Sequence, residues 1–421
     1  MDLISEELSE TDLGFKIDID FIIAVLLWVD DVITCVEGKE DQEQVLKMIN
    51  EFAIKHKLKW GQAKCNVMKV GKHKQEAEEW KLGEMVIEET NKYKYLGDII
   101  TANGKNTENI QNRNVKLKAT TININTIASS ETLFRIETSV LLEMHDKRCI
   151  TGLLNNSESW HLLKKEEQQF EKMEIEAIKY LFDLPLHTPT VAIIFSFGLL
   201  FTTQRIDMKQ LIYLQKILRE EENDNLKRSL KVLEAKNIGW YKKIVQSLQK
   251  YDLPTDFSII ASIPPKRWEN TVKFVIERKN KERIMDELHK TENDVKIPKT
   301  KTKTIVDKLK DPYYTRQPES EIIHTTKNET KTIMIARYGI LECGRNFKGK
   351  MPLICATCGI KDDESHRLNV CPKWAIDATA LPRQIDFNLI YEKDIDIIRP
   401  ILANIYLLWN TKCSNGTMIT K

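Results

Sequence analysis

The sequence predicts an α+β fold, with strands in the first hundred residues and helices in most of the chain that follows. Short apolar runs rich in β-branched residues occupy residues 21–29 and 32–36, and such runs are typical of buried strands. From about residue 107 onward, apolar residues recur at helical spacing. Near the carboxyl end, three cysteines and one histidine gather between residues 355 and 371 and indicate a small metal-binding unit.

Composition limits the class of protein. Charged residues make up 30% and hydrophobic residues 42% of the 421 residues, which is typical of a globular chain. The net charge is only +2, so a nucleic-acid partner would need a local basic patch. No apolar run reaches the roughly 20 residues of a membrane span, and the acidic first residues lack the basic segment of a signal peptide. We therefore expect an intracellular protein of the cytoplasm, the nucleus or both, without membrane contact.

The first two predicted strands meet at Asp30 and Asp31, so a tight hairpin would hold two carboxylates at its tip. Adjacent carboxylates repel each other and resist burial, and a divalent cation relieves both effects. Mg²⁺ bound by oxygen ligands is the ion used in nucleotidyl transfer. The alternative is a solvated turn that contains two aspartates.

A helix is predicted next, over residues 40–56. Val45, Met48, Ile49 and Phe52 recur at positions i, i+3, i+4 and i+7, which gives the helix one apolar face. This face would lie on the sheet.

Three further strands are predicted before residue 105. Residues 58–71 read as a turn followed by a strand that contains Lys64. Residues 80–87 and 93–100 follow as two strands, and the second of these carries Tyr95, Leu96 and Gly97.

The rest of the chain to about residue 310 is predicted to be helical, with amphipathic segments at 140–154 and 164–181. Residues 240–243 and 266–268 mix basic and aromatic side chains. Lysines 296, 299, 301, 303, 308 and 310 form a basic window that is opposed only by Asp307. These segments would track a nucleic-acid backbone or form a solvated flexible linker, and we favour the linker.

The order of the motifs resembles the palm of reverse transcriptases from non-LTR retrotransposons. The shared features are an aromatic-x-Asp-Asp hairpin, a helix, a Lys-x-x-x-Met strand that contains Lys64, and a Lys-Tyr-Leu-Gly motif. The resemblance implies that Asp30 and Asp31 bind catalytic Mg²⁺ and that Lys64 approaches the phosphates of the incoming nucleotide as a general acid. It also implies that the segment Tyr95, Leu96, Gly97 is a primer grip. The alternative for Lys64 is a surface lysine on an edge strand, and the alternative for the Tyr95 segment is an ordinary strand end.

The helical region carries further likeness to the same elements. Residues 156–160, the helix after them, and residues 182–185, 197–200 and 205–206 resemble the thumb, which would clamp the template and primer through phosphate contacts. The alternative for most apolar residues of these helices is plain core packing.

The spacing C-x₂-C-x₇-H-x₄-C predicts a zinc site made of Cys355, Cys358, His366 and Cys371. Thiolates and an imidazole suit tetrahedral Zn²⁺, and four protein ligands make the site closed and structural. The alternative is a chance cluster of reduced cysteines. The spacing also resembles the C-terminal CCHC knuckle of non-LTR elements, which is taken to bind nucleic acid. Arg337 to Gly339 and Arg345 to Lys348 would fit beside RNA.

These expectations combine into a reverse-transcriptase-derived protein that uses Mg²⁺ and Zn²⁺ and handles an RNA template, a DNA primer and dNTPs. The resemblance implies fingers and a first palm strand, with its own metal-binding Asp, that lie upstream of the hairpin and are missing here. We therefore expect no autonomous polymerase activity. The alternative is a non-catalytic nucleic-acid-binding protein that uses thumb and knuckle. The predicted segments are a partial palm at 1–105, a helical thumb at 106–220, a charged helical connector at 221–330, a zinc knuckle at 331–380 and a tail at 381–421.

Overall fold

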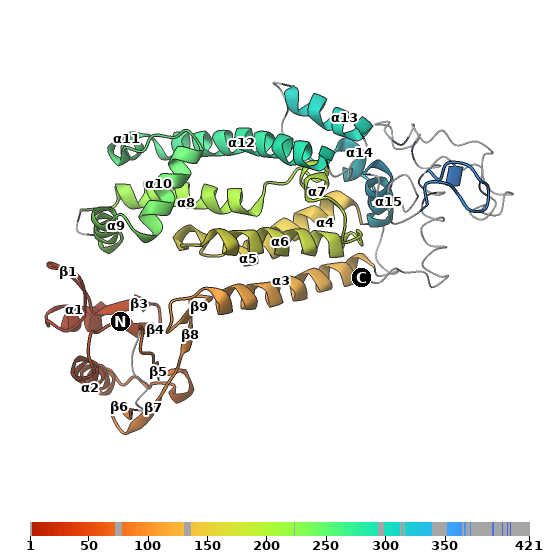
Figure 1. Cartoon of the computed structure of the whole chain (residues 1–421). Coiled ribbons are helices and arrows are strands. Elements are labelled where there is room, and N and C mark those ends of the chain that lie inside the picture. Colours follow the sequence, from red (N-terminus) through yellow and green to blue (C-terminus); the bar gives the residue numbers. More distant parts are fainter. Residues whose placement is uncertain are drawn as a thin grey trace. The chain divides into compact units, whose positions relative to one another are not determined.

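The structure is a computed structural model that describes residues 2–71, 78–129, 136–222, 224–293, 299–311, 314, 316–338, 352–363, 366–367, 371, 390, 398, 402 and 405. Short β-ladders occupy the first hundred residues, and most of the described chain after residue 107 is helical (Figure 1). The mixed α+β class predicted from the sequence is therefore confirmed.

The chain divides into two compact units, each of which is discontinuous in sequence. The first consists of Met1–Asn112, Asn156–Leu162 and Gln210–Trp268, and the second of Arg113–Asn155, Leu163–Lys209 and Glu269–Lys421. The five predicted segments are continuous, so this division does not test them.

Four small β-structures belong to the first unit. Three are antiparallel hairpins: β1 (Phe15–Asp18) with β2 (Phe21–Ile23), β3 (Val25–Trp28) with β4 (Asp31–Thr34), and β8 (Lys92–Tyr95) with β9 (Asp98–Thr101). In the fourth, β7 (Met85–Glu89) lies between β6 (Trp80–Leu82) and the parallel strand β5 (Asn66–Val67).

Three segments that were each predicted as one strand are in fact two strands. Residues 21–29 form β2 and β3, which pair with different partners. Residues 80–87 and 93–100 are hairpins, because Gly83 (φ 63°), Leu96 (φ 46°) and Gly97 (φ 94°) take left-handed conformations that reverse the chain. Two-residue hairpin turns require such positive φ values. The prediction was wrong because it followed the apolar runs and missed this turn chemistry.

Two helices cover the core of the first unit. Helix α2 (Lys39–Lys55) confirms the helix predicted at 40–56 and buries Val45, Ile49 and Phe52. Helix α1 (Asp2–Ser9) adds Ile4 and Leu8 to the same apolar cluster, which also contains Trp80. Each such side chain contributes roughly 1.5–3 kcal/mol when fully buried.

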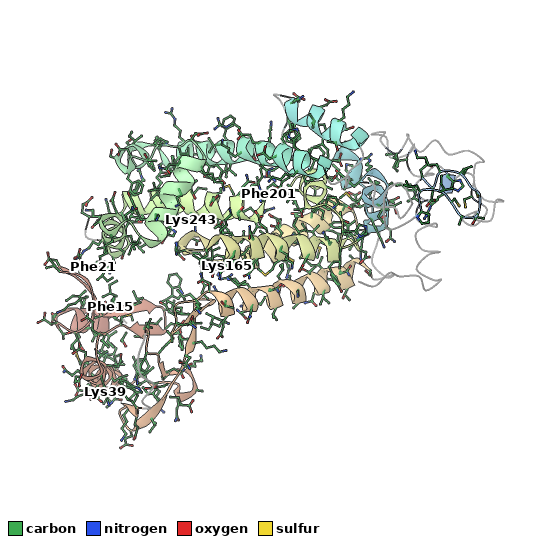
Figure 2. All side chains as sticks on the ribbon, in the orientation of Figure 1. Phe15, Phe21, Lys39, Lys165, Phe201 and Lys243 are labelled. Carbon is green, nitrogen blue, oxygen red and sulfur yellow. The ribbon has the colours of Figure 1, made fainter. Side chains whose placement is uncertain are left out.

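The remaining helices of the first unit are α9 (Asn225–Lys236), α10 (Gly239–Lys250) and α11 (Phe257–Ser262). The guanidinium carbon of Arg228 lies 4.3 Å from the ring centroid of Phe21, which Figure 2 labels. Trp240 and Trp268 are buried. The indole N–H of Trp240 donates to the Glu158 carbonyl and that of Trp268 to the Leu211 carbonyl, both at 2.9 Å. These tryptophans therefore pack in the core. They are not exposed to stack on nucleic-acid bases, which corrects the interpretation that their segments track a nucleic acid.

The second unit contains most of the other helices. Helix α6 (Lys164–Leu181) has the bounds predicted from the sequence. The others are α3 (Thr107–Ala128), α4 (Thr138–Met144), a π-helical turn (His145–Ile150), α5 (Thr151–Leu153), α7 (Thr190–Ser196), α8 (Thr202–Arg219), α12 (Pro265–Asn293), α13 (Lys299–Lys310), α14 (Ser320–Ile323) and α15 (Lys327–Arg337); α3, α8 and α12 also contribute residues to the first unit. No described helix combines the length and apolarity that crossing a bilayer requires.

Two phenylalanines of the segments that resemble a thumb pack in the interior of the second unit. The rings of Phe182 and Phe197 stack with their centroids 4.7 Å apart, and both side chains are buried. Arg283 donates two hydrogen bonds of 2.8 Å to Glu171. Its guanidinium carbon also lies 3.6 Å from the ring centroid of Phe201, labelled in Figure 2. The interior is thus held by aromatic contacts and a bidentate ion pair.

Helix α13 corrects the expectation of a flexible linker at residues 299–310. Thr302, Ile305 and Leu309 lie on one face at helical spacing and are buried. Lys308 contacts the buried carboxylate of Glu319 at 3.3 Å. The dense lysines of this segment hide its apolar face in the sequence. Lys296 lies outside the described residues.

A close backbone contact joins α7 to the segment before α14. Gly198 has φ 59°, and a Cβ atom placed on it would lie 2.4 Å from the carbonyl carbon of Gln317 and 2.5 Å from the nitrogen of Pro318. Arg316 donates to the Gly198 carbonyl at 2.6 Å, and the Glu319 N–H donates to the Ser196 carbonyl at 2.9 Å. Only glycine satisfies both the backbone conformation and the space.

We expect Gly198→Ala to destabilise the protein by on the order of 3 kcal/mol, because the methyl group meets rigid backbone as well as a left-handed conformation. Gly104 is the matched control, since it has φ 66° and open space around its Cβ position. Gly104→Ala should cost only the conformational strain, about 1 kcal/mol. Urea unfolding of both variants measures the difference, and equal losses would contradict the close contact.

The π-helical turn begins at a buried histidine. The side chain of His145 is 1% exposed, and neither ring nitrogen has a hydrogen-bond partner among the described residues. Burial, and then the positive charge of Arg205, lower the pKa of His145 to about 4, while Asp146 acts in the opposite direction. The folded protein therefore holds this imidazole neutral at pH values where an unfolded chain protonates it.

The free energy of unfolding should consequently fall as the pH drops from 6.5 towards 4. Above pH 6.5 His145 is neutral in both the folded and the unfolded chain, so its titration no longer lowers the stability. The shift from 6.5 to about 4 corresponds to roughly 3 kcal/mol. Measuring the free energy of unfolding against pH tests this. His145→Gln should flatten that part of the curve, whereas His161→Gln, at an exposed position, should leave it unchanged.

Candidate functional site

The hairpin of β3 and β4 places both predicted catalytic aspartates at its tip. Trp28 pairs with Asp31, so Val29 and Asp30 form a two-residue loop, and all four residues are exposed. Val29 takes φ 56° although its side chain is β-branched. Such a conformation costs roughly 1–3 kcal/mol and clusters at functional sites in proteins.

Asp31 lies close to the hairpin of β8 and β9. The pKa of the Tyr93 phenol and that of the Tyr95 phenol are both raised, first by burial and then by the negative charge of Asp31. The hydroxyl of Tyr93 donates to the carbonyl of Lys64 at 3.2 Å. The Tyr93 hydroxyl therefore joins strand β8 to the Lys64 backbone, and the charge of Asp31 acts on both phenols of that strand.

Lys64 differs in detail from the prediction. It ends a 3₁₀ turn, Gln62–Lys64, and β5 begins only at Asn66. The contact to Tyr93 uses the Lys64 carbonyl, while the Lys64 side chain is exposed. Gly61 precedes this turn in an extended conformation and the Cys65 N–H donates to the Gln62 carbonyl, so local hydrogen bonding replaces a strand ladder here.

The predicted primer-grip residues form the turn between β8 and β9. Leu96 and Gly97 both have positive φ, as a type I′ turn requires. Asn156 donates at 2.9 Å to the Leu96 carbonyl and also at 2.9 Å to the carboxylate of Asp98. Asn109 donates at 2.9 Å to the other oxygen of Asp98. Sequence reasoning missed the network formed by these polar side chains, because single Asn residues at such separations carry no pattern.

Metal ligation at Asp30 and Asp31 lacks a third partner in the part of the chain that the structure describes. Among the described residues, the Cys/His cluster is the group in which three or more His, Cys, Asp or Glu side chains lie close enough to share an ion. Neither aspartate belongs to it. Asp30 and Asp31 therefore form, at most, part of a two-metal site.

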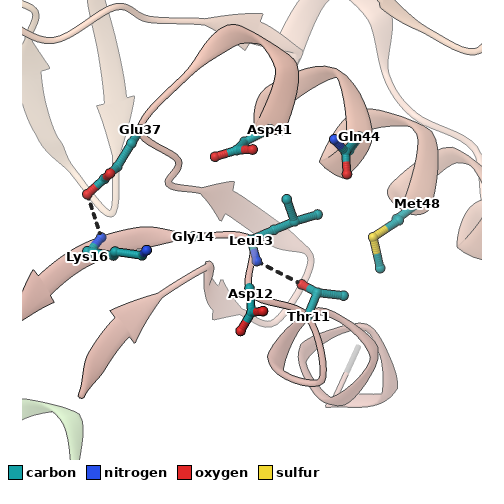
Figure 3. Close-up of a pocket in the computed structure, with 9 residues that line it drawn as sticks. All are labelled: Thr11, Asp12, Leu13, Gly14, Lys16, Glu37, Asp41, Gln44 and Met48. Carbon is teal, nitrogen blue, oxygen red and sulfur yellow. Dashed lines mark hydrogen bonds between the residues drawn. The ribbon is translucent and has the colours of Figure 1, made fainter. Parts of the chain in front are cut away.

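A depression of about 520 Å³ lies elsewhere on the first unit, and Figure 3 shows its lining. Acidic side chains from Asp12, Glu37 and Asp41 surround it, and the Lys16 N–H donates to Glu37 at 3.1 Å. None of the predicted catalytic residues lines it.

The predicted zinc ligands converge near the end of the chain. Cys355 and Cys358 flank a turn in a short ribbon, residues 352–363, which we call the zinc ribbon. The Cys355 N–H donates to the Ile360 carbonyl and the Gly359 N–H to the Cys355 carbonyl, both at 2.8 Å. Gly359 has φ 68°, which lets the chain reverse directly after Cys358.

The four ligand atoms form a compact group. All lie within 4.8 Å of one another, and the Sγ atom of Cys371 is 3.7 Å from those of both Cys355 and Cys358. Sulfur atoms at the corners of a tetrahedron with Zn–S bonds of 2.3 Å are about 3.8 Å apart. The group can therefore hold a metal ion such as zinc.

The imidazole of His366 supports this conclusion independently. It is 4% exposed, and neither ring nitrogen has a hydrogen-bond partner among the described residues. Backbone contacts place it: the His366 N–H donates to Asp363 at 2.9 Å, and the Cys371 N–H donates to the His366 carbonyl at 2.9 Å. A buried imidazole without polar partners costs free energy that metal coordination removes.

The pKa values of two of the ligand thiols shift in opposite directions. The neighbouring His366 and then the backbone N–H of Thr357 lower the pKa of Cys355 to about 6. Burial and the neighbouring thiols Cys371 and Cys355 raise the pKa of Cys358 to about 11. A second thiolate in this space is therefore unfavourable, and a divalent cation would stabilise the thiolates together.

No protein-family model, curated protein or solved structure matches this chain. The assignment of the candidate sites therefore depends on the residues and their geometry.

We expect the full chain to bind about one zinc ion and Cys358→Ser to weaken the affinity by more than the roughly 10- to 100-fold that loss of an outer-shell partner costs. Cys35→Ser is the matched control, because Cys35 lies in the first unit, outside the ligand group. Zinc content and competition with a chelator measure both. Equal affinity in Cys358→Ser and the wild type would show that the four residues are not the site.

Proposed function

We propose that this protein is derived from a reverse transcriptase and binds a primer–template nucleic acid. In this proposal residues 1–105 act as a partial palm, 106–220 as a helical thumb and 221–330 as a helical connector. The reaction of the lineage is RNA-directed DNA synthesis from dNTPs. The order of the sequence motifs and the mixed α+β character of the fold support the assignment.

The position of Asp31 carries the proposal. Its negative charge raises the pKa of the Tyr95 phenol after burial does, and Tyr93 on the same strand contacts the backbone of Lys64. A metal-dependent phosphoryl transfer needs acidic ligands, a phosphate-binding cation and a primer-holding element within a few ångströms of one another. The hydrogen bond from Tyr93 to the Lys64 backbone and the effect of the Asp31 charge on Tyr95 support this assignment of the three segments.

Each of these residues has a definite role in the proposal. The carboxylates of Asp30 and Asp31 would ligate Mg²⁺, which when bound supplies Lewis-acid stabilisation to the attacking and leaving oxygens. The exposed ammonium of Lys64 would neutralise phosphate charge. The turn at Leu96 and Gly97 would support the primer strand through its backbone.

The described residues supply only two of the carboxylates that a two-metal site needs. We therefore expect the chain alone, with an RNA template, a DNA primer, dNTPs and Mg²⁺, to bind the duplex without extending the primer. A primer-extension assay tests this. Extension that Asp31→Asn abolishes and Asp18→Asn preserves would contradict the expected inactivity and establish Asp31 as catalytic.

The zinc ribbon favours a second candidate function, which is nucleic-acid binding without catalysis. The four ligands form a closed group of the structural type, so the ribbon would present a surface and leave no open position for chemistry. Arg337 and Tyr338 are buried in the second unit, so they do not form the RNA contact suggested by their sequence position, and Gly339 and residues 345–348 lie outside the described residues.

One comparison separates the two candidates. If the palm-like hairpin holds the duplex through bound cations, Asp31→Asn should weaken primer–template binding in Mg²⁺ and have no effect in EDTA. If thumb and knuckle alone bind, removing zinc should weaken binding while Asp31→Asn leaves it unchanged. Fluorescence anisotropy with labelled duplex at fixed salt measures both, because salt alone alters affinity.

A further inference from the structure

Helix α3 carries apolar side chains on two opposite faces. Leu117, Thr121 and Ile124 are buried on one face, which packs in the interior of the second unit. Because successive residues of a helix are rotated by about 100°, Val115 and Ile122 lie on the opposite face, where they are 67% and 47% exposed. In Figure 1 the labelled helices of the second unit lie to one side of α3, which agrees with this division into a buried and an exposed face.

The exposed face has the spacing of a coiled-coil seam. Val115, Ala119, Ile122 and Thr126 follow one another at intervals of four, three and four residues, and all four are exposed. These intervals are those of positions d, a, d and a of a heptad, which face a partner helix in a coiled coil. We call these four residues the α3 seam.

The α3 seam is complementary in size to a second copy of itself. When two such helices run antiparallel, an a position of one faces a d position of the other. Ala119 then faces Ile122 of the second copy, and Val115 faces Thr126 of the second copy. Each layer combines a larger with a smaller side chain, so the seam fills evenly. A parallel pair would oppose Ala119 to itself beside a layer of two isoleucines, which leaves a gap.

The flanking side chains permit the antiparallel pairing. Lys116 and Lys118 flank the first half of the seam, and Asn123 and Asn125 flank the second half. In the antiparallel pair each lysine therefore lies beside an asparagine of the second copy, and no like charges meet across the seam.

One further cation lies near the seam, and its charge is balanced within the chain. Lys327 donates to the side chain of Asn125 and forms an ion pair of 2.7 Å with Asp183. Its side chain is only 12% exposed. It therefore does not oppose the approach of Lys118 from a second copy.

We infer that two copies of this chain associate through the α3 seam as an antiparallel, two-fold symmetric helix pair. A surface that is complementary to itself forms a closed dimer, because the same patch is used on both copies. The seam is roughly 17 Å long at 1.5 Å per residue. It is smaller than the roughly 800 Å² per partner of a standard interface, so the dimer is weak and exchanges with the monomer. The inference does not depend on the proposed nucleic-acid function.

The test measures the mass of the full chain, loaded with zinc, by sedimentation equilibrium at concentrations from about 1 to 100 µM. The samples are treated with nuclease and kept reduced, so that neither shared nucleic acid nor disulfides link the copies. The average mass should rise with concentration from 49.0 kDa towards twice that value.

Ile122→Lys should weaken the dimer by more than about tenfold, because pairing would bury an ammonium without a partner. Val140→Lys is the matched control, since this valine is 45% exposed on α4 and lies outside the seam. It adds the same charge and should dimerise like the wild type. Both variants should unfold at the wild-type urea concentration when the protein is dilute, because both side chains are exposed in the monomer.

A second measurement tests the orientation of the helices. The photoreactive residue p-benzoylphenylalanine, placed at position 126, should crosslink to the segment around Val115 of the second copy, and mass spectrometry of the crosslinked peptides identifies the partner segment. Crosslinks between the two segments around position 126 would show a parallel pair and overturn the inference.

The sedimentation results also separate the alternatives. A wild-type mass that stays at 49.0 kDa at every concentration overturns the inference, and an acidic helix of another protein would then be the occupant of the seam. A dimer that Ile122→Lys leaves intact overturns it too, because the copies would then associate through another surface. Primer–template binding, measured separately, stands or falls independently of both results.

Discussion

Left-handed backbone conformations at tight turns position Asp31, Tyr95 and Cys358 in this protein. Val29 reverses the chain before Asp31, Leu96 and Gly97 do so after Tyr95, and Gly359 does so after Cys358. The turns at Val29 and at Leu96 join their strands through two-residue loops, so side chains on the two arms stay in fixed register. The candidate sites are therefore properties of hairpins, and the helices supply the packing that supports them.

The two candidate sites each bring ionisable groups of like charge together, but they differ in solvent exposure. Asp30 and Asp31 remain in water, where adjacent carboxylates repel each other only weakly. Cys355, Cys371 and His366 are buried close together, where a second thiolate is costly without a cation. Solvent screens the carboxylates in the first arrangement, whereas metal coordination would stabilise the buried thiolates of the second. Metal dependence of folding should accordingly be confined to the zinc ribbon.

Hydrogen-bonded polar side chains link the hairpin that carries Tyr95 to distant parts of the first unit. Asp98 accepts from Asn109 and Asn156, and Asn156 also holds the Leu96 carbonyl. These bonds join strand, helix α3 and the turn at residue 156 around one carboxylate. Such a network keeps the position of the hairpin independent of any ligand, because each bond is made within the chain.

The sequence by itself determined the α+β class, helix α2, helix α6 and the convergence of Cys355, Cys358, His366 and Cys371, because helical periodicity and ligand spacing are local patterns. Only the tertiary structure decided that Trp240 and Trp268 are core residues, that α13 packs through its apolar face, and that the Tyr93 hydroxyl contacts the Lys64 carbonyl. Burial and contact between distant segments depend on how both units, each discontinuous in sequence, close around their cores. No local pattern in the chain encodes that closure.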